Sequence, residues 1–294
     1  MTRHEIKEPR QLTFEGVHKL KVITIAGKVD VVGAGGPGGP DGDRTATIDI
    51  TRVRGHDSVI VELIDGELTV RHGDFKPGLL GWVLGGRKIE SDISISVPPD
   101  CLVDVSVVSG PLVVSNLHET TKVQGVSGEI TLNAIHGPAT AKTISGSITA
   151  ESVTDDLSAH TVSGSITVIA LGTDSRIKAG TTSGAITVDL EDGSDAPRVD
   201  LNCVSGTVTV RVPADANLAV DMATMHGRTT SAFPELTSRA MFSGGPRLGT
   251  PQKLTGTLGT GAGHLKAHAV SGDMTVLRRT PNPDLEALEA AKDA

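Results

Sequence analysis

The chain has 294 residues, with 27 Lys and Arg against 35 Asp and Glu and a formal net charge of −8. This acidic balance, with no basic stripe along the chain, argues against duplex nucleic acid as a partner. Aromatic residues are limited to four Phe and one Trp, so single-stranded nucleic acid has few side chains to stack on, and the core has to be built from Val, Ile, Leu and Ala.

The cysteines and the N-terminal residues indicate in which cellular compartment the protein is expected. Cys101 and Cys203 are 102 residues apart (203 − 101), and they form neither a disulfide framework nor a CxxC metal site. The first residues, MTRHEIKEPRQL, contain no apolar signal segment. The longest strongly apolar run, residues 79–84, is far shorter than the ~20 residues of a membrane-spanning helix. We therefore expect a soluble, cytoplasmic protein with free thiols.

Residues 1–100 predict looser N-terminal β repeats and a cap. Apolar residues alternate on both sides of Gly27 and of Gly66, which is the pattern of two short strands that meet at a glycine. Between these two copies, residues 33–43 read GAGGPGGPDGD, and this composition predicts a flexible loop.

Residues 79–84 hold the one concentrated apolar patch of the sequence. Its apolar members are Leu79, Leu80, Trp82, Val83 and Leu84. Because the end of a stacked β structure exposes its core, we interpret this patch as a cap. The alternative is an exposed contact for a partner or a membrane surface, since a Trp followed by basic residues suits both.

Residues 101–279 form the regular part of the chain, a repeat centred on a Ser-Gly pair in copies such as VSGEITL and VSGSITV. Successive glycines are 18, 18, 18, 20 and 22 residues apart, and a last gap of 66 residues leaves room for about three more turns. Two degenerate copies fit inside that gap, around Gly227 and Gly256. The glycines of the seven plain copies, which we predict to be structural corners, are Gly110, Gly128, Gly146, Gly164, Gly184, Gly206 and Gly272.

Each copy places apolar residues at five fixed positions around its serine. In the copy that contains Ser163 they are Leu157, Ala159, Val162, Ile166 and Val168. Alternation on both sides of a glycine predicts two short strands and a corner, and a unit of 18–22 residues buries its apolar row only by stacking on its neighbours. We therefore expect an all-β fold, a capped parallel β-solenoid (β-helix) of about ten coils. An antiparallel sandwich is the structural alternative.

Residues 280–294 follow the solenoid. Leu285 and Leu288 have helical spacing after an Asn-Pro-Asp start, so this segment predicts a short C-terminal helix or a frayed tail.

The repeats also carry a resemblance to a known family. Copies such as VSGSITV, the run LKVITIAGKVDVVG, the segment ISVPPD and the ending VSGDMTVLRR resemble the bacterial putative-adhesin family, the β-strand-repeat family known as domain-of-unknown-function family 4097. The resemblance covers nearly the whole chain. It implies a β-helix and a role near bacterial envelope or stress functions, and it implies no catalytic residues. The chain departs from a surface adhesin because it shows no signal, anchor or membrane span.

Two periodic features of the repeat could be taken for functional sites. The Ser-Gly pairs are interpreted as a ladder of corners, because no GxSxG elbow is present and seven copies cannot each be a nucleophile. An outward threonine row fits ordinary sheet chemistry, and the alternative is a flat surface that binds ice or a polysaccharide. The row consists of Thr131, Thr149, Thr167, Thr187, Thr209 and Thr275.

His118 and His136 are the weak candidates for a metal site. Each lies nine residues after a serine, so on coils of 18 residues the two histidines should stack one above the other. A zinc site needs three or four ligands, and the pattern supplies no third, so we expect no tight zinc binding and no cofactor. Asp156 and Asp174 stack in the same way, and they are the only carboxylates that fit an enzyme built on one solenoid face.

These patterns favour a non-enzymatic β-solenoid scaffold or protein-interaction module, with a protein as its partner. The alternative is an envelope- or membrane-associated accessory factor that contacts its target through residues 79–84. A surface-binding threonine face is a further alternative. The partner, the handedness, the number of strands per coil and the oligomeric state do not follow from the sequence.

Overall fold

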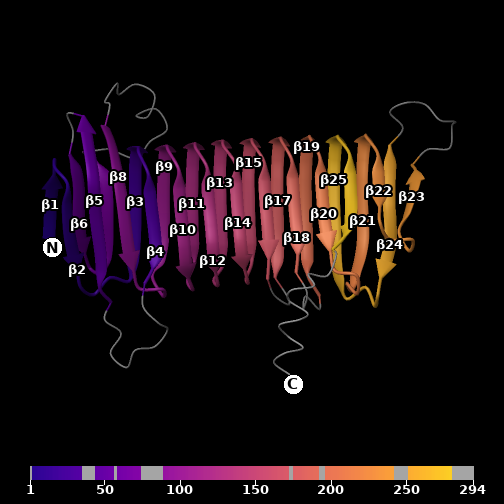
Figure 1. Cartoon of the computed structure of the whole chain (residues 1–294), viewed down its shortest axis with the longest axis horizontal. Coiled ribbons are helices and arrows are strands. Elements are labelled where there is room, and N and C mark those ends of the chain that lie inside the picture. Colours follow the sequence, from indigo (N-terminus) through magenta and orange to yellow (C-terminus); the bar gives the residue numbers. More distant parts are fainter. Residues whose placement is uncertain are drawn as a thin grey trace, which may run out of the picture.

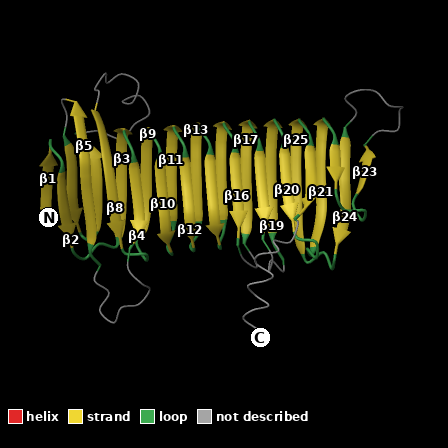
Figure 2. Cartoon of the chain, viewed as in Figure 1, coloured by secondary structure: helices red, strands yellow, loops and turns green. Residues whose placement is uncertain are grey.

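Two long β-sheets lie face to face and run the length of the molecule (Figure 1). The structure is a computed structural model that describes residues 2–34, 44–55, 58–73, 89–171, 175–191, 196–241 and 251–279. These residues form strands and loops only (Figure 2), so none of them supplies a helix that is long and apolar enough to cross a membrane. Buried apolar side chains form one continuous core between the sheets, from Ile6 to Val276.

The two sheets are named sheet A and sheet B. The fourteen strands of sheet A, in spatial order, are β1 (Thr2–Ile6), β6 (Val59–Ile64), β7 (Glu67–His72), β3 (Lys19–Ala26), β9 (Leu102–Ser109), β11 (Thr121–Ser127), β13 (Ala139–Ser145), β15 (Leu157–Ser163), β17 (Arg176–Ser183), β19 (Arg198–Ser205), β25 (Gly263–Ser271), β21 (Leu218–His226), β24 (Gln252–Leu258) and β23 (Thr237–Ala240). The twelve strands of sheet B are β2 (Arg10–Phe14), β5 (Ala46–Gly55), β8 (Ile89–Val97), β4 (Val29–Gly33), β10 (Leu112–Leu117), β12 (Ile130–Ile135), β14 (Ile148–Val153), β16 (Ile166–Ala170), β18 (Ile186–Leu190), β20 (Val208–Val212), β26 (Met274–Arg278) and β22 (Thr229–Ser231).

From β9 to β20 each repeat contributes one strand to each sheet, and all neighbours are parallel. Equivalent residues lie side by side, so that Ile148 pairs with Ile166 and Ile166 with Ile186. The parallel, all-β arrangement expected from the repeats is confirmed, and each coil here has two strands.

A glycine at each corner allows successive coils to approach closely. A Cβ atom on Gly164 would lie 2.1 Å from the carbonyl oxygen of Gly146 in the preceding coil, and the φ angle of Gly164 is +154°. No real Cβ atom tolerates such a contact with backbone. The same relation holds for the other corner glycines, so the position is restricted to glycine by backbone packing.

A buried side chain fastens several of these corners from inside. Thr161 Oγ1 donates to the carbonyl oxygen of Gly146 at 3.1 Å, and Thr181 Oγ1 donates to that of Gly164 at 3.1 Å. Thr224 makes the same bond to Gly272 at 2.9 Å. Each bond joins a strand of sheet A to the corner of the coil stacked beside it, so the hydroxyl satisfies a carbonyl that the sheet ladders leave out.

The N-terminal coils depart from the expected repeat. The strands β6 and β7 form an antiparallel hairpin within sheet A, and its turn is Asp65–Gly66, with φ angles of 49° and 78°. Gly66 was expected at a corner between two strands of a coil, and this expectation is wrong. The Asp-Gly dipeptide with two positive φ angles is the signature of a tight hairpin turn. Antiparallel pairing also joins β1 to β6, β2 to β5 and β5 to β8.

The C-terminal coils are not stacked in sequence order. The strands β25 and β26, the last along the chain, lie between the β19–β20 coil and the β21–β22 coil. Gly227 is a corner stacked on Gly272, as the degenerate repeat predicts. Gly256 lies within β24, which pairs antiparallel with β21, so the coil expected around Gly256 does not exist.

Four sequence expectations concern residues that the structure does not describe. They are the flexible loop over most of residues 33–43, the cap at residues 79–84, including Leu79, Leu80, Trp82 and Leu84, the stacking of Asp156 on Asp174, of which Asp174 lies outside the described residues, and the C-terminal helix or tail at 280–294.

Candidate functional site

The predicted histidine pair is brought together by the parallel stacking. The ring centroids of His118 and His136 are 5.0 Å apart in an edge-to-face arrangement. His118 Nδ1 lies 3.6 Å from Asp100 Oδ1, and His136 Nδ1 lies 3.2 Å from Thr154 Oγ1. Across the residues that the structure describes, no group of three or more His, Cys, Asp or Glu side chains is placed to hold a metal ion.

The threonine row is in register on the outer face of sheet B. Thr131 pairs with Thr149, and the ladder continues strand by strand to Thr209 and Thr275. Thr230 of β22 extends it, with its Oγ1 3.0 Å from that of Thr275. The next outward positions carry Glu151, Ile169 and Asp189, so the threonines form a single row beside uneven neighbours.

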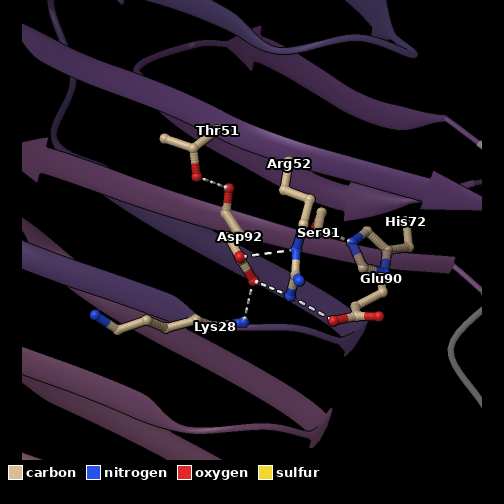
Figure 3. Close-up of polar contacts among 7 residues, drawn as sticks. All are labelled: Lys28, Thr51, Arg52, His72, Glu90, Ser91 and Asp92. Carbon is tan, nitrogen blue, oxygen red and sulfur yellow. Dashed lines mark hydrogen bonds and ion pairs between the residues drawn. The ribbon is translucent and has the colours of Figure 1, made fainter.

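A polar cluster in the N-terminal coils was not expected from the sequence (Figure 3). Arg52 Nε lies 2.9 Å from Asp92 Oδ2, and Arg52 Nη2 contacts both Asp92 Oδ1, at 3.1 Å, and Glu90. The Lys28 N–H donates to Asp92 Oδ1 at 3.1 Å. The cluster sits where β5 shifts register against β8, between Ile50 and Arg52. These ion pairs and hydrogen bonds hold the strand pairing across this bulge.

Beside the cluster lies a buried serine–histidine pair, Ser91 and His72, which are 0% and 2% exposed. His72 Nδ1 accepts a hydrogen bond from the Ile25 N–H at 3.0 Å, so the ring proton is on Nε2, 2.5 Å from Ser91 Oγ. A protonated Nε2 donates to the serine and cannot take its proton, which is the reverse of a nucleophile–base pair. We interpret this contact as a hydrogen bond of the core.

The outer face of sheet A carries a row of exposed apolar side chains. Ile144 is 53% exposed, Val204 48%, Val270 51% and Met225 47%. Each member lies one position before a corner serine, or before His226 in the case of Met225. In spatial order, from β9 to β21, this apolar row consists of Val108, Val126, Ile144, Val162, Thr182, Val204, Val270 and Met225. Val108 and Val126 are half-buried, and Thr182 is the polar member of the row.

The sequence pattern assigned these positions to the core, and the structure places them outside. In the copy at Ser163, Ala159 points inward, and Val162 is three residues further along the same strand. Because side chains alternate in a strand, positions three apart face opposite sides. Thr161, at the even spacing, is the buried residue. The spacing alone therefore contained the signal for an exposed row.

A groove of about 620 Å³ runs along this row across β15, β17, β19, β25, β21 and β24. Its apolar wall consists of Val204, Val270, Met225 and Met241. No sequence pattern singled out the two methionines: Met225 belongs to the irregular copy near Gly227, and Met241 directly follows β23.

The polar wall of the groove is the neighbouring outward row, where His160, Gly180, Asn202, His268 and Ala223 lie in register. A Cβ atom on Gly180 would lie 2.7 Å from His160 Nδ1, so the glycine leaves space that the ring occupies. Lys178 is not part of this row, because its coil is two residues longer than the preceding one and Lys178 pairs with Ser158.

Charge on this face is opposite in sign to that of the chain. The two outward rows beside the apolar row, from β9 to β24, carry five lysines and three aspartates: Lys122, Lys142, Lys178, Lys253, Lys266, Asp104, Asp200 and Asp221. Asp221 is paired with Lys253 at 3.0 Å.

Two side chains that line the groove, His160 and Cys203, have shifted pKa values. Burial lowers the pKa of His160 below its usual value, and the charges of Lys142 and Lys178 lower it further, so the ring is neutral at pH 7. Burial also raises the pKa of the Cys203 thiol.

The family model for Toastrack DUF4097 matches residues 31–277. The chain belongs to the Toastrack DUF4097 family. The resemblance carried by the Gly-centred repeats is thereby confirmed, since the match includes every corner glycine from Gly110 to Gly272.

Solved structures similar to this Toastrack chain are distant in sequence. A putative adhesin from Bacteroides fragilis is 12% identical, with 92% of this chain and 97% of that chain covered and a TM-score of 0.42. A putative lipid binding protein from Parabacteroides distasonis is 13% identical, with 93% and 97% covered and a TM-score of 0.45. A search of curated proteins gives no match. The Toastrack assignment therefore rests on the family model.

Proposed function

We propose that this protein is a non-enzymatic interaction module that binds a partner protein on the outer face of sheet A. The observation that carries the proposal is the apolar row. Of the ten large hydrophobic side chains exposed among the described residues, five lie in this row, and Met241 borders the same groove. Contiguous exposed apolar surface rimmed by polar residues is typical of interaction sites.

The chemistry of the groove supports binding over catalysis. Its apolar wall is made of valine and methionine side chains, and methionines adapt their shape to a bound surface. Its one carboxylate, Asp221, is neutralised by Lys253. The serine–histidine pair lies elsewhere, in the core at β7 and β8, with its proton on the wrong nitrogen for a base.

The test is affinity capture from the native cell, followed by mass spectrometry, with three forms of the protein. Val204→Glu places a charge in the apolar row. Thr187→Glu is the matched control, because it places the same charge on the outer face of sheet B. A partner captured by the wild type and the control, and lost with Val204→Glu, is the expected result. A partner set that does not change with Val204→Glu would contradict a binding site on this face.

A further inference from the structure

We infer that the occupant of the apolar row is an amphipathic α-helix of the partner, with an acidic flank. This inference rests on the proposed function and names the chemistry of its partner. It combines the direction of the row, the openness of the groove and the charge of the neighbouring side chains.

The direction of the row favours a helix over an extended peptide. The row crosses eight parallel strands, from β9 to β21, and each of them is paired on both sides. Their backbone groups are therefore occupied, so an extended chain on this face finds no strand edge to pair with. A helix satisfies its own backbone and offers only side chains.

The length of the row suits a helix of ordinary size. Eight strands leave seven spacings of ~4.8 Å, so the row is about 34 Å long. A helix that covers it has about 22 residues at ~1.5 Å per residue. Its apolar stripe, at positions i, i+3, i+4 and i+7, lies against the valines and isoleucine of the row.

The open shape of the groove argues against a single acyl chain. The groove lies on the surface of a sheet, and its apolar wall residues are themselves about half exposed. An acyl chain in such a trough leaves much of its surface in water, whereas the outer side of an amphipathic helix is polar.

The charge of the neighbouring rows selects an acidic helix. Five lysines face three aspartates over these strands. Lys253 and Asp221 form an ion pair at 3.0 Å, and Asp200 lies 3.8 Å from His264, so an excess of two lysines remains. A helix with Glu or Asp along the flank that faces these lysines is attracted to them. A second copy of this chain that docks through the same face presents the same excess of lysine and is repelled.

The test uses synthetic helical peptides of 22 residues and fluorescence anisotropy. The first peptide has Leu along one stripe and Glu on the flank beside it, and in the second every Glu is replaced by Lys. We expect the Glu peptide to bind at least tenfold more tightly than the Lys peptide. Val204→Glu should weaken binding of the Glu peptide at least tenfold, and Thr187→Glu should leave it unchanged.

A charge reversal distinguishes docking of an acidic helix from non-specific hydrophobic binding. Lys142→Glu should weaken binding of the Glu peptide and strengthen binding of the Lys peptide. Equal affinity for the two peptides, or no effect of Val204→Glu, would overturn the inference. If Val204→Glu melts well below the wild type, Val162→Glu, in the same row, replaces it.

Other occupants are separate outcomes of the same experiment. Sedimentation with anionic phospholipid vesicles that depends on Val204, without peptide binding, would identify a lipid surface and overturn the helix. A dimer that depends on Val204 would identify a second copy and do the same. A peptide of residues 280–294 that binds more tightly than the Glu peptide would identify this chain's own C-terminal segment. If the peptides fail while capture of a partner still depends on Val204, the helix is wrong and the proposed function stands.

Discussion

Single glycines decide how closely the coils approach. Gly164 and Gly16 both have positive φ angles, +154° and +73°, but they differ in their surroundings. A Cβ atom on Gly164 would meet the Gly146 carbonyl oxygen at 2.1 Å, whereas nothing lies within 4 Å of one on Gly16. The two positions therefore separate the cost of the φ angle from the cost of the contact.

Substitution by alanine tests this difference. Gly16→Ala should lower the free energy of unfolding by about 1 kcal/mol, the cost of the left-handed conformation. Gly164→Ala should cost more, about 2–4 kcal/mol, because strain of about 1–3 kcal/mol is joined by displacement of the neighbouring coil. Urea midpoints of the two variants measure this. Equal midpoints would show that the coils are free to move apart at the corner.

The buried thiol of Cys101 should make the stability of the fold decrease at alkaline pH. Burial raises the pKa of Cys101 from 9.0 to about 11, so the folded chain keeps this proton while the unfolded chain loses it above pH 9. The stability that the thiol contributes is present below pH 9 and falls as the pH rises toward 11. Relative to Cys101→Ala, the wild type should lose stability between pH 8 and pH 10.5 in urea unfolding. A difference between the two proteins that does not change with pH would contradict this assignment.

At the scale of the strand, period-two alternation predicted much and was misread once. It placed Leu157, Ala159, Ile166 and Val168 in the core, and all four are buried. Val162 was grouped with them because it is apolar, although its odd spacing puts it on the other face. At Val162 the apolar side chain predicted burial, whereas the odd spacing from Ala159 predicted exposure. The spacing was the correct guide. The exposed row, and with it the candidate site, follows from that conflict.

Other parts of the fold depend on contacts distant in sequence. The Asp65–Gly66 turn carries a local hairpin signal, and it was masked by its fit to the repeat template. Nothing local indicates that β24 pairs antiparallel with β21 or that β25 lies between β19 and β21. Such choices depend on which edge buries more apolar surface, and that is a property of the assembled sheets.

Two threonines test how one coil is fastened to the next. Thr181 is buried and donates to the Gly164 carbonyl oxygen at 3.1 Å, whereas Thr187 lies in the outward row of sheet B. Thr181→Val keeps the shape and leaves that carbonyl without its donor, so unfolding should become easier by about 1 kcal/mol or more. Thr187→Val should change stability by less than ~0.5 kcal/mol. Similar thermal shifts for both variants would contradict a role for the inner hydroxyl.

For the whole molecule, the place of a strand in the stack should determine its protection from hydrogen exchange more than its place in the sequence does. The strands β25 and β26 are the last along the chain, but each has a neighbour on both sides, whereas β22 and β23 each have one. Hydrogen exchange should therefore be slower in residues 263–278 than in residues 229–240. Mass spectrometry of peptides from the two segments measures it. Faster exchange in 263–278 would show that the C-terminal coil frays as an end.

The inserted position of β25 and β26 has a consequence for synthesis on the ribosome. Stacking from the N-terminus can proceed coil by coil as far as β19 and β20, whose permanent neighbours are made fifty residues later, after residues 213–262. At ~5–20 residues per second those edges stay open for roughly 3–10 s. During that time two parallel strands present unpaired backbone groups to other chains. The nascent protein is thus most vulnerable to misassembly when about two thirds of it is already folded.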